Sequence, residues 1–154
     1  MDNWYQTLGV QVVFASGGGI YTSAAEAAAK VGGKLIGVDV DQSANINTYG
    51  EGMCVTSAMK GLAETVKHML SEVVAGNFAN YGGKIETLGL VSGDDPTANY
   101  VQIPMETTQW GDGFSQDDYK ALVKDMFDGK ITVSNDITAM PQTTITVNEY
   151  GNIK

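Results

Sequence analysis

The sequence predicts an α/β fold with a mostly parallel sheet, because segments typical of buried strands alternate with segments typical of helices. The first unit shows this best. The apolar runs Val10–Ala15 and Leu35–Val38 have the length and β-branched content of strands buried on both faces. The Ala-rich segment Ala24–Val31 between them is expected to be a helix that begins with a capping box of Ser23 and Glu26. Together they predict a βαβ unit with a right-handed crossover.

The rest of the chain continues this alternation. In chain order, we expect a strand over Met53–Met59, a helix over Lys60–Val74, a strand over Lys84–Leu90, a helix over Ser115–Phe127, a strand over Ile131–Val133 and an extended tail over Thr143–Ile153. Asp118 follows Ser115 by three residues, as in a helix cap, and Gly129 stands where a helix commonly ends. No internal repeat or low-complexity segment interrupts the pattern. Residues 1–154 are therefore expected to form a single α/β domain.

Composition restricts the classes of partner. The 154 residues carry a formal net charge of -9, which repels polyanions, so nucleic acid and anionic membranes are poor candidates. Cys54 is the only cysteine, which excludes an internal disulfide and a four-ligand cysteine metal site. The sequence has neither a signal-peptide pattern at Met1–Trp4 nor the run of roughly 18 apolar residues that a membrane span needs.

A glycine loop follows the first predicted strand and consists of Ser16, Gly17, Gly18 and Gly19. Glycines let backbone N–H groups approach a ligand, and a helix amino terminus is partially positive, so such a loop can bind an anion or a sugar hydroxyl. The alternative is a tight turn that lets the helix pack on the sheet. A dinucleotide-binding fingerprint would need a glycine where Thr22 stands.

Three charged residues form the second group of candidates. Asp39 and Asp41 are alternate residues after the second strand, so their side chains are expected to point out of the sheet edge where α/β proteins bind ligands. They suit hydroxyl groups or a divalent cation, although aspartates also serve turns alone, and no third metal ligand lies nearby in sequence. Lys60 at the start of a helix has the wrong charge for helix stability. This misfit indicates either a binding role or a solvated lysine.

Other chemically active residues are interpreted as structural. His68 lies in mid-helix without a nucleophile placed as its partner, and Cys54 has no motif around it. Asp94–Asp95 is interpreted as a turn and Asp117–Asp118 as acids of a first helical turn. Trp110 either stacks on a ligand ring or anchors its loop. We therefore expect no catalytic residue, no bound metal and no cofactor.

The segments Val12–Gly19, Ile36–Gln42 and Val55–Lys60 resemble, in order and spacing, the basic membrane protein family of ABC-transporter solute-binding lipoproteins, which includes purine nucleoside receptors. The similarity covers Trp4–Val133. Within it, Gly93–Gly113 matches poorly. The resemblance implies a type 1 periplasmic-binding fold, in which two three-layer α/β/α lobes close on a ligand as a hinged clamp.

The resemblance also implies roles for individual residues. In that family the glycine loop, the strand-end aspartate and the lysine line the cleft, so their counterparts here are Gly18, Gly19, Asp39 and Lys60. Asp39 would accept hydroxyls of the ribose, the backbone at Gly18 and Gly19 would approach the sugar, and Lys60 would donate to the ligand or hold Asp39 in place. The expected protein is not an enzyme but an extracytoplasmic, membrane-anchored lipoprotein that delivers a nucleoside-like ligand to ABC permease subunits.

By the same resemblance, residues 1–154 are the carboxyl-terminal part of a two-lobe protein, with the amino-terminal lobe, the lipoprotein signal and the base-stacking aromatic residues upstream of Met1. We then expect weak binding or none by this chain alone, and self-association through an apolar surface left open. Two alternatives stay open. One is a nucleotide-cofactor-dependent enzyme with a Rossmann-like core, in which Asp39 binds the cofactor ribose. The other is a ligand-sensing regulatory lobe of the same fold.

Overall fold

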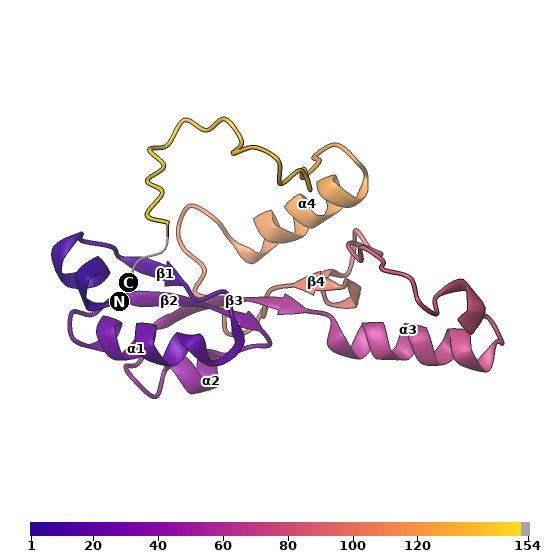
Figure 1. Ribbon diagram of the computed structural model, residues 1–154, viewed down its shortest axis with the longest axis horizontal. Helices are drawn as coiled ribbons and strands as arrows, with labels where there is room; N and C mark the ends of the chain where they lie inside the picture. The colour runs from indigo at the N-terminus through magenta and orange to yellow at the C-terminus, as the bar shows by residue number, and fades with distance from the viewer. Residues whose placement is uncertain (152–154) are drawn as a thin grey trace.

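The computed structural model describes residues 1–151 and confirms an α/β fold with an open, mostly parallel sheet (Figure 1). In chain order the elements are η1 (Asn3–Thr7), β1 (Val12–Phe14), η2 (Gly18–Ile20), α1 (Tyr21–Ala29), β2 (Lys34–Asp39), α2 (Ser43–Ile46), β3 (Cys54–Lys60), α3 (Leu62–Val74), η3 (Phe78–Asn80), η4 (Pro96–Ala98), β4 (Val101–Gln102) and α4 (Gln116–Phe127).

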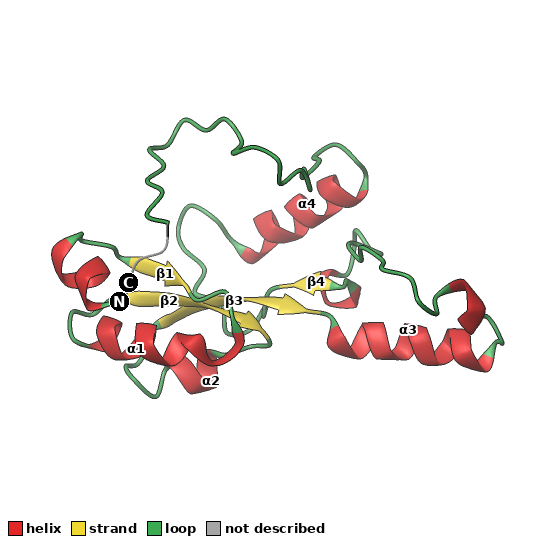
Figure 2. Ribbon diagram, in the orientation of Figure 1, coloured by secondary structure: helices red, strands yellow, loops and turns green. Residues whose placement is uncertain are grey.

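The sheet has the strand order β1-β2-β3-β4, with β2 between β1 and β3 (Figure 2). The first three strands are parallel, and the short β4 pairs antiparallel with the end of β3. Val13 lies opposite Leu35, and Leu35 lies opposite Cys54. Because β1, β2 and β3 run in the same direction, their carboxyl ends lie at one edge of the sheet. This edge carries the glycine loop, Asp39 and Lys60.

Both crossover helices lie on the same face of the sheet. Each new strand is added on the same side of the previous one, and right-handed crossovers then place α1 and α2 on one face. The alanines of α1 let this helix approach the strands closely. The core on this face consists of Tyr5, Val13, Ala24, Ala25, Ala27, Ala28, Leu35, Ile46, Met53 and Cys54.

The opposite face of β1 and β2 is open over the described residues, and the three-layer arrangement of the expected lobe stays a prediction. On β1, Val12 and Phe14 point away from the core, and Phe14 is 50% exposed. A second helix layer forms when the strand order reverses, and β1 to β3 show no reversal. Helix α3 runs away from the sheet instead of returning over it, and none of its residues is buried (Figure 1). Over the described part of the chain, the open face therefore has no second helix layer.

Two predicted strands are absent from the described structure. Lys84–Leu90 and Ile131–Val133 have the residue pattern of strands but form no ladder. The first segment makes one backbone hydrogen bond next to β4, from Tyr100 N–H to Gly89 O at 3.1 Å, and does not extend it into a strand pair. Ile85, in the first of them, is fully exposed. The tail is irregular from Thr143 to Gly151, and its last predicted positions, 152 and 153, lie outside the described residues. The local sequence pattern was therefore a wrong guide to strand pairing in these two segments.

The predicted helix boundaries agree with the structure at α4 and differ from it at α1. The capping box at Ser115 and Asp118 is present, and Gly129, with φ of 76°, follows the end of α4. The predicted capping box at Ser23 is wrong. Helix α1 begins at Tyr21 and continues directly from the turn η2, so Ser23 lies inside the helix.

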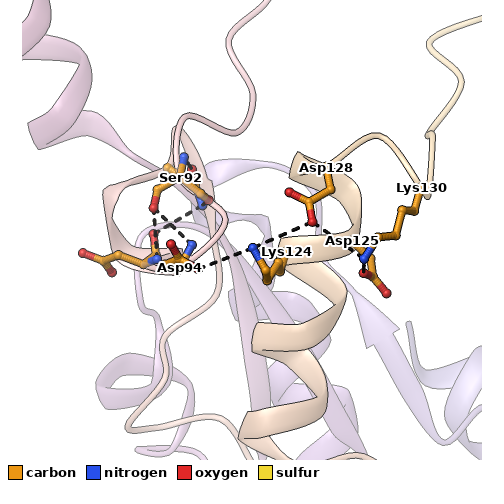
Figure 3. A network of polar contacts seen from close by, with 8 residues as sticks. Ser92, Asp94, Lys124, Asp125, Asp128 and Lys130 are labelled. Carbon is orange, nitrogen blue, oxygen red and sulfur yellow. Dashed lines mark hydrogen bonds and ion pairs between the residues drawn. The ribbon is translucent and has the colours of Figure 1, made fainter.

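Surface ion pairs join the Ser92–Asp95 turn to the end of α4 (Figure 3). Lys124 Nζ lies 3.6 Å from Asp94 Oδ1 and 3.7 Å from Asp128 Oδ2. Since these side chains are largely exposed, the pairs contribute little stability, and the buried Val123 contributes more to holding α4 in place.

No helix within residues 1–151 combines the length and the apolar character needed to cross a membrane.

Gly37 provides a test of the packing at the centre of the sheet. A Cβ atom at this position would lie 2.6 Å from Ser57 Oγ and 2.9 Å from Gln42 Cβ, so the substitution must displace buried atoms. We expect Gly37→Ala to lower the free energy of unfolding by about 1–3 kcal/mol, measured by urea denaturation. Gly19→Ala is the control, because a Cβ there meets open space. Equal effects of the two substitutions would contradict this packing.

The exposed apolar side of α3 leads to a prediction on self-association. Leu62, Val66, Leu70 and Val73 recur at helical spacing and are all exposed, with Val66 at 57% and Leu70 at 59%. We expect sedimentation velocity to show concentration-dependent species larger than the monomer. The double variant Val66→Glu, Leu70→Glu should shift the distribution towards monomer. A wild-type chain that stays monomeric at every concentration would refute the prediction.

Candidate functional site

The carboxyl edge of the sheet brings Asp39 and Lys60 into contact. Asp39 ends β2 and Lys60 ends β3, and the two strands are parallel neighbours. Lys60 Nζ lies 2.6 Å from Asp39 Oδ1. The expectation that Lys60 opens a helix was wrong, because β3 extends through Lys60 and α3 begins at Leu62. The charge that looked misplaced at a helix start is instead paired with a carboxylate on the neighbouring strand.

Gly61 lies between the end of β3 at Lys60 and the start of α3 at Leu62. A Cβ at position 61 would overlap the carbonyl oxygen of Asn99 and lie 2.9 Å from the Cα of Tyr100. In addition, Gly61 N–H donates to Tyr100 O at 2.8 Å. This close backbone approach needs a glycine. It holds the end of β3, and with it Lys60, at the edge of the sheet.

Asp39 has a strained backbone. Its φ is 71°, and it is the only non-glycine residue with a positive φ in the described structure. Val40 N–H donates to Val38 O at 2.8 Å, so the chain turns sharply at Asp39. For a residue with a Cβ this conformation costs about 1–2 kcal/mol, although aspartate tolerates it better than most. Strain of this kind concentrates at functional positions, which makes Asp39 the first candidate at this edge.

The glycine loop lies at the carboxyl end of β1, the strand next to β2. Ser16 N–H donates to Phe14 O at 3.1 Å and Gly17 N–H donates to Ala15 O at 2.9 Å, so both donors are used within the chain. Gly18 has a φ of 44°, which favours glycine, and both it and Gly19 are exposed. Among the four predicted loop residues, Gly18 and Gly19 are therefore the better candidates for ligand contact through backbone N–H groups.

Gln42, which the sequence interpretation did not select, links the glycine loop to both strands. Its side-chain Nε2 donates to Gly18 O at 3.2 Å, and its Oε1 accepts from Val38 N–H at 3.0 Å. Its backbone N–H donates to the buried Ser57 Oγ at 3.1 Å. The signal in the sequence was a glutamine that closes the motif Ile36–Gln42. The linking role of Gln42 could not be predicted from the sequence, because hydrogen bonds between distant segments have no sequence signature.

Asp41 makes hydrogen bonds within the chain, and its contact with a ligand stays a prediction. Its Oδ1 accepts from Ser43 N–H at 2.9 Å at the start of α2, and its Oδ2 accepts from Thr107 Oγ1 at 2.8 Å. Burial alone would raise the pKa of Asp41, but these hydrogen bonds to the ionised form outweigh it and hold the pKa below its usual value. Both carboxylate oxygens are thus engaged within the chain.

The remaining reactive residues fit the structural interpretation. The ring of His68 makes edge contacts with Tyr81 and Tyr100, at centroid distances of 5.6 and 6.3 Å. The thiol of Cys54 is buried, and burial raises its pKa, which disfavours the nucleophilic thiolate. Trp110 anchors its loop, since its Nε1 donates to Met105 O at 3.1 Å. Residues 1–151 contain no group of three or more His, Cys, Asp or Glu side chains placed to hold a metal ion.

The Asp39–Lys60 pair lies in an open setting, with side-chain exposures of 37% and 65%. An ion pair as exposed as this one contributes at most about 1 kcal/mol to stability. A polar ligand can therefore replace either partner at low cost.

Comparison of the chain with models of known protein families gave no match, and comparison with curated proteins gave none.

The Asp41 contacts predict a pH-dependent contribution to stability. Because the pKa is lower in the folded state, the contribution is complete above the unfolded pKa of about 3.9 and is lost as the pH falls through the folded value. Asp41→Asn should lower the free energy of unfolding by about 1 kcal/mol near pH 7, and this difference should shrink at acidic pH. Urea denaturation across this pH range measures it, with the exposed Asp112→Asn as control. A pH-independent difference would contradict the assignment.

Proposed function

We propose that this chain is one lobe of an extracytoplasmic solute-binding protein that delivers a nucleoside to an ABC importer. The observation that carries the proposal is the Asp39–Lys60 pair at 2.6 Å, held at the carboxyl edge of a parallel sheet. In open α/β sheets, ligands bind outside the carboxyl ends of the strands, usually where the strand order reverses. Since β1 to β3 show no reversal, the support at this edge comes from the two charged side chains themselves. The fold proposed for the lobe is the type 1 periplasmic-binding fold, which the three sequence motifs resemble.

A ribose ring suits the donors and acceptors at this edge. Its vicinal hydroxyls donate hydrogen bonds, and the ionised carboxylate of Asp39 is an acceptor-only group that can take two of them. Charge-assisted hydrogen bonds of this type are about twice as strong as neutral ones. Lys60 either donates to the same hydroxyls or keeps the carboxylate oriented. Gly18 and Gly19 allow the sugar to approach the backbone closely, because no side chain stands in the way.

The open setting of the pair supports reversible binding between two lobes. Small ligands in proteins usually have 70–90% or more of their surface buried, which a single open edge does not achieve. Asp39 and Lys60 remain substantially exposed, so a second surface is needed to enclose a ligand on them. In the proposal, that surface is the amino-terminal lobe, which also supplies the base-stacking aromatic residues. Membrane anchoring of the complete protein and contact with permease subunits are parts of the same proposal.

A nucleotide-cofactor-dependent enzyme is the second candidate, favoured by one observation. The order β1-β2-β3 with an acid at the end of β2 is also that of the first half of a dinucleotide-binding fold, where the acid binds the cofactor ribose. Thr22 stands in place of the third glycine of that fingerprint. The ion pair of Lys60 with the same acid fits the receptor better. A ligand-sensing lobe would share the edge and differ only in its partner.

Removal of the Asp39 carboxylate tests the receptor proposal. In the complete, leader-free protein, we expect Asp39→Ala to weaken nucleoside binding by at least about 2 kcal/mol, or roughly thirty-fold, because a charge-assisted hydrogen bond is lost. Calorimetric titration with inosine, guanosine and adenosine measures the change. Asp41→Asn is the matched control, since that carboxylate is engaged within the fold. Unchanged affinity in Asp39→Ala, or binding of NAD alone, would refute the assignment.

A further inference from the structure

Gln42 is one of the few buried polar residues within residues 1–151, with 6% of its surface exposed. An amide buried without partners costs about 1–3 kcal/mol, so a glutamine in this position needs its hydrogen bonds. Each polar end of the side chain has a partner. No buried side-chain nitrogen or oxygen among the described residues lacks one. Its bonds reach segments 24 and 4 residues away in the sequence, and both segments belong to the candidate site.

The two side-chain bonds of Gln42 connect the backbones on either side of the site. The acceptor oxygen binds the N–H of Val38, the residue directly before Asp39. The donor nitrogen binds the carbonyl of Gly18 in the glycine loop. Because the amide group is planar and rigid, it fixes the spacing between these two backbone segments. Gly18 is thereby held in its positive-φ conformation beside the strand that ends in Asp39.

Gln42 also makes a hydrogen bond with strand β3. Its backbone N–H donates to Ser57 Oγ, and Ser57 is completely buried. Gly37 has no side chain, and a Cβ there would lie within 2.9 Å of the Gln42 side-chain oxygen. The orientation of the amide is therefore fixed by β2 and β3 together. The segments that resemble the receptor family, Val12–Gly19, Ile36–Gln42 and Val55–Lys60, each contribute to this contact.

We propose that Gln42 is the positioning residue of the binding edge, because its side-chain amide fixes the glycine loop relative to Asp39 before a ligand arrives. Glycine-rich segments lose much conformational entropy on ordering, and ordering during binding reduces affinity. A loop held by Gln42 is ordered on folding instead. The inference rests on the proposed function, since it assigns Gln42 to the nucleoside site. Gln42 itself, being buried, does not contact the ligand.

Gln42→Glu is the selective test. The ionised side chain keeps an oxygen acceptor for Val38 N–H but has no donor for Gly18 O, so only the link to the loop is broken. We expect the backbone amide signals of Gly18 and Gly19 to shift in the ¹⁵N spectrum of the ligand-free chain. In the complete protein, the dissociation constant for inosine should rise at least tenfold at about pH 8. Because burial raises the pKa of a glutamate, the side chain becomes neutral and regains a donor as the pH is lowered, and part of the affinity should return.

Gln11→Glu is the matched control, because it makes the same substitution at an exposed position just before β1. It should change neither the glycine signals nor the affinity for inosine. Unchanged inosine affinity in a folded Gln42→Glu protein would overturn the proposal, and so would glycine signals identical to those of the wild type. A reduced affinity accompanied by shifts throughout the ¹⁵N spectrum would also contradict it, because that result indicates general damage to the fold.

A measurement on the wild-type chain covers the case in which Gln42→Glu fails to fold. The side-chain amide protons of Gln42 should be protected from solvent exchange and show NOEs to the Gly18 Hα protons. Rapid exchange or missing NOEs would overturn the proposal without any variant. These readouts need no ligand. If the wild-type protein does not bind inosine while the contacts of Gln42 are present, the proposed function fails and the link between the loop and β2 stands.

Discussion

The parallel pairing of β2 with both β1 and β3 is the constraint on which the other features depend. It places three strand ends at one edge and so brings together residues from separate parts of the chain. The Asp39–Lys60 contact follows from the pairing of β2 with β3, and the Gln42–Gly18 bond from that of β2 with β1. The adjacent strand order also places α1 and α2 on one face and leaves Phe14 exposed on the other.

The sequence predicted the first half of the fold well because its signals there are local and agree with one another. The apolar runs of β1 and β2, the alanines of α1 and the glycines between them all indicate the same βαβ unit. Prediction was poorer for Lys84–Leu90 and Ile131–Val133, whose patterns suit strands. A strand needs a neighbour, and pairing between distant segments is not encoded in the pattern of either segment alone.

The candidate site shows the same limit at the level of single residues. Sequence position selected Asp39 and Lys60, and the structure places them in contact, although the helix argument used for Lys60 was wrong. Asp41 looked equivalent to Asp39 because the two alternate along the chain. Only the hydrogen bonds with Ser43 and Thr107 separate them, and Thr107 lies 66 residues away. Gln42 was missed for the same reason, since its partners come from three motifs.

Chemical-shift mapping of inosine on the ¹⁵N-labelled chain tests the central claim most directly, because it detects weak binding and reports where it occurs. We expect saturable shifts of the backbone signals of Gly18, Gly19, Asp39 and Lys60 with inosine, and none of comparable size with NAD. These four residues lie at the carboxyl ends of three parallel strands. Shifts confined to other surfaces, or saturable shifts with NAD alone, would contradict a nucleoside site at this edge.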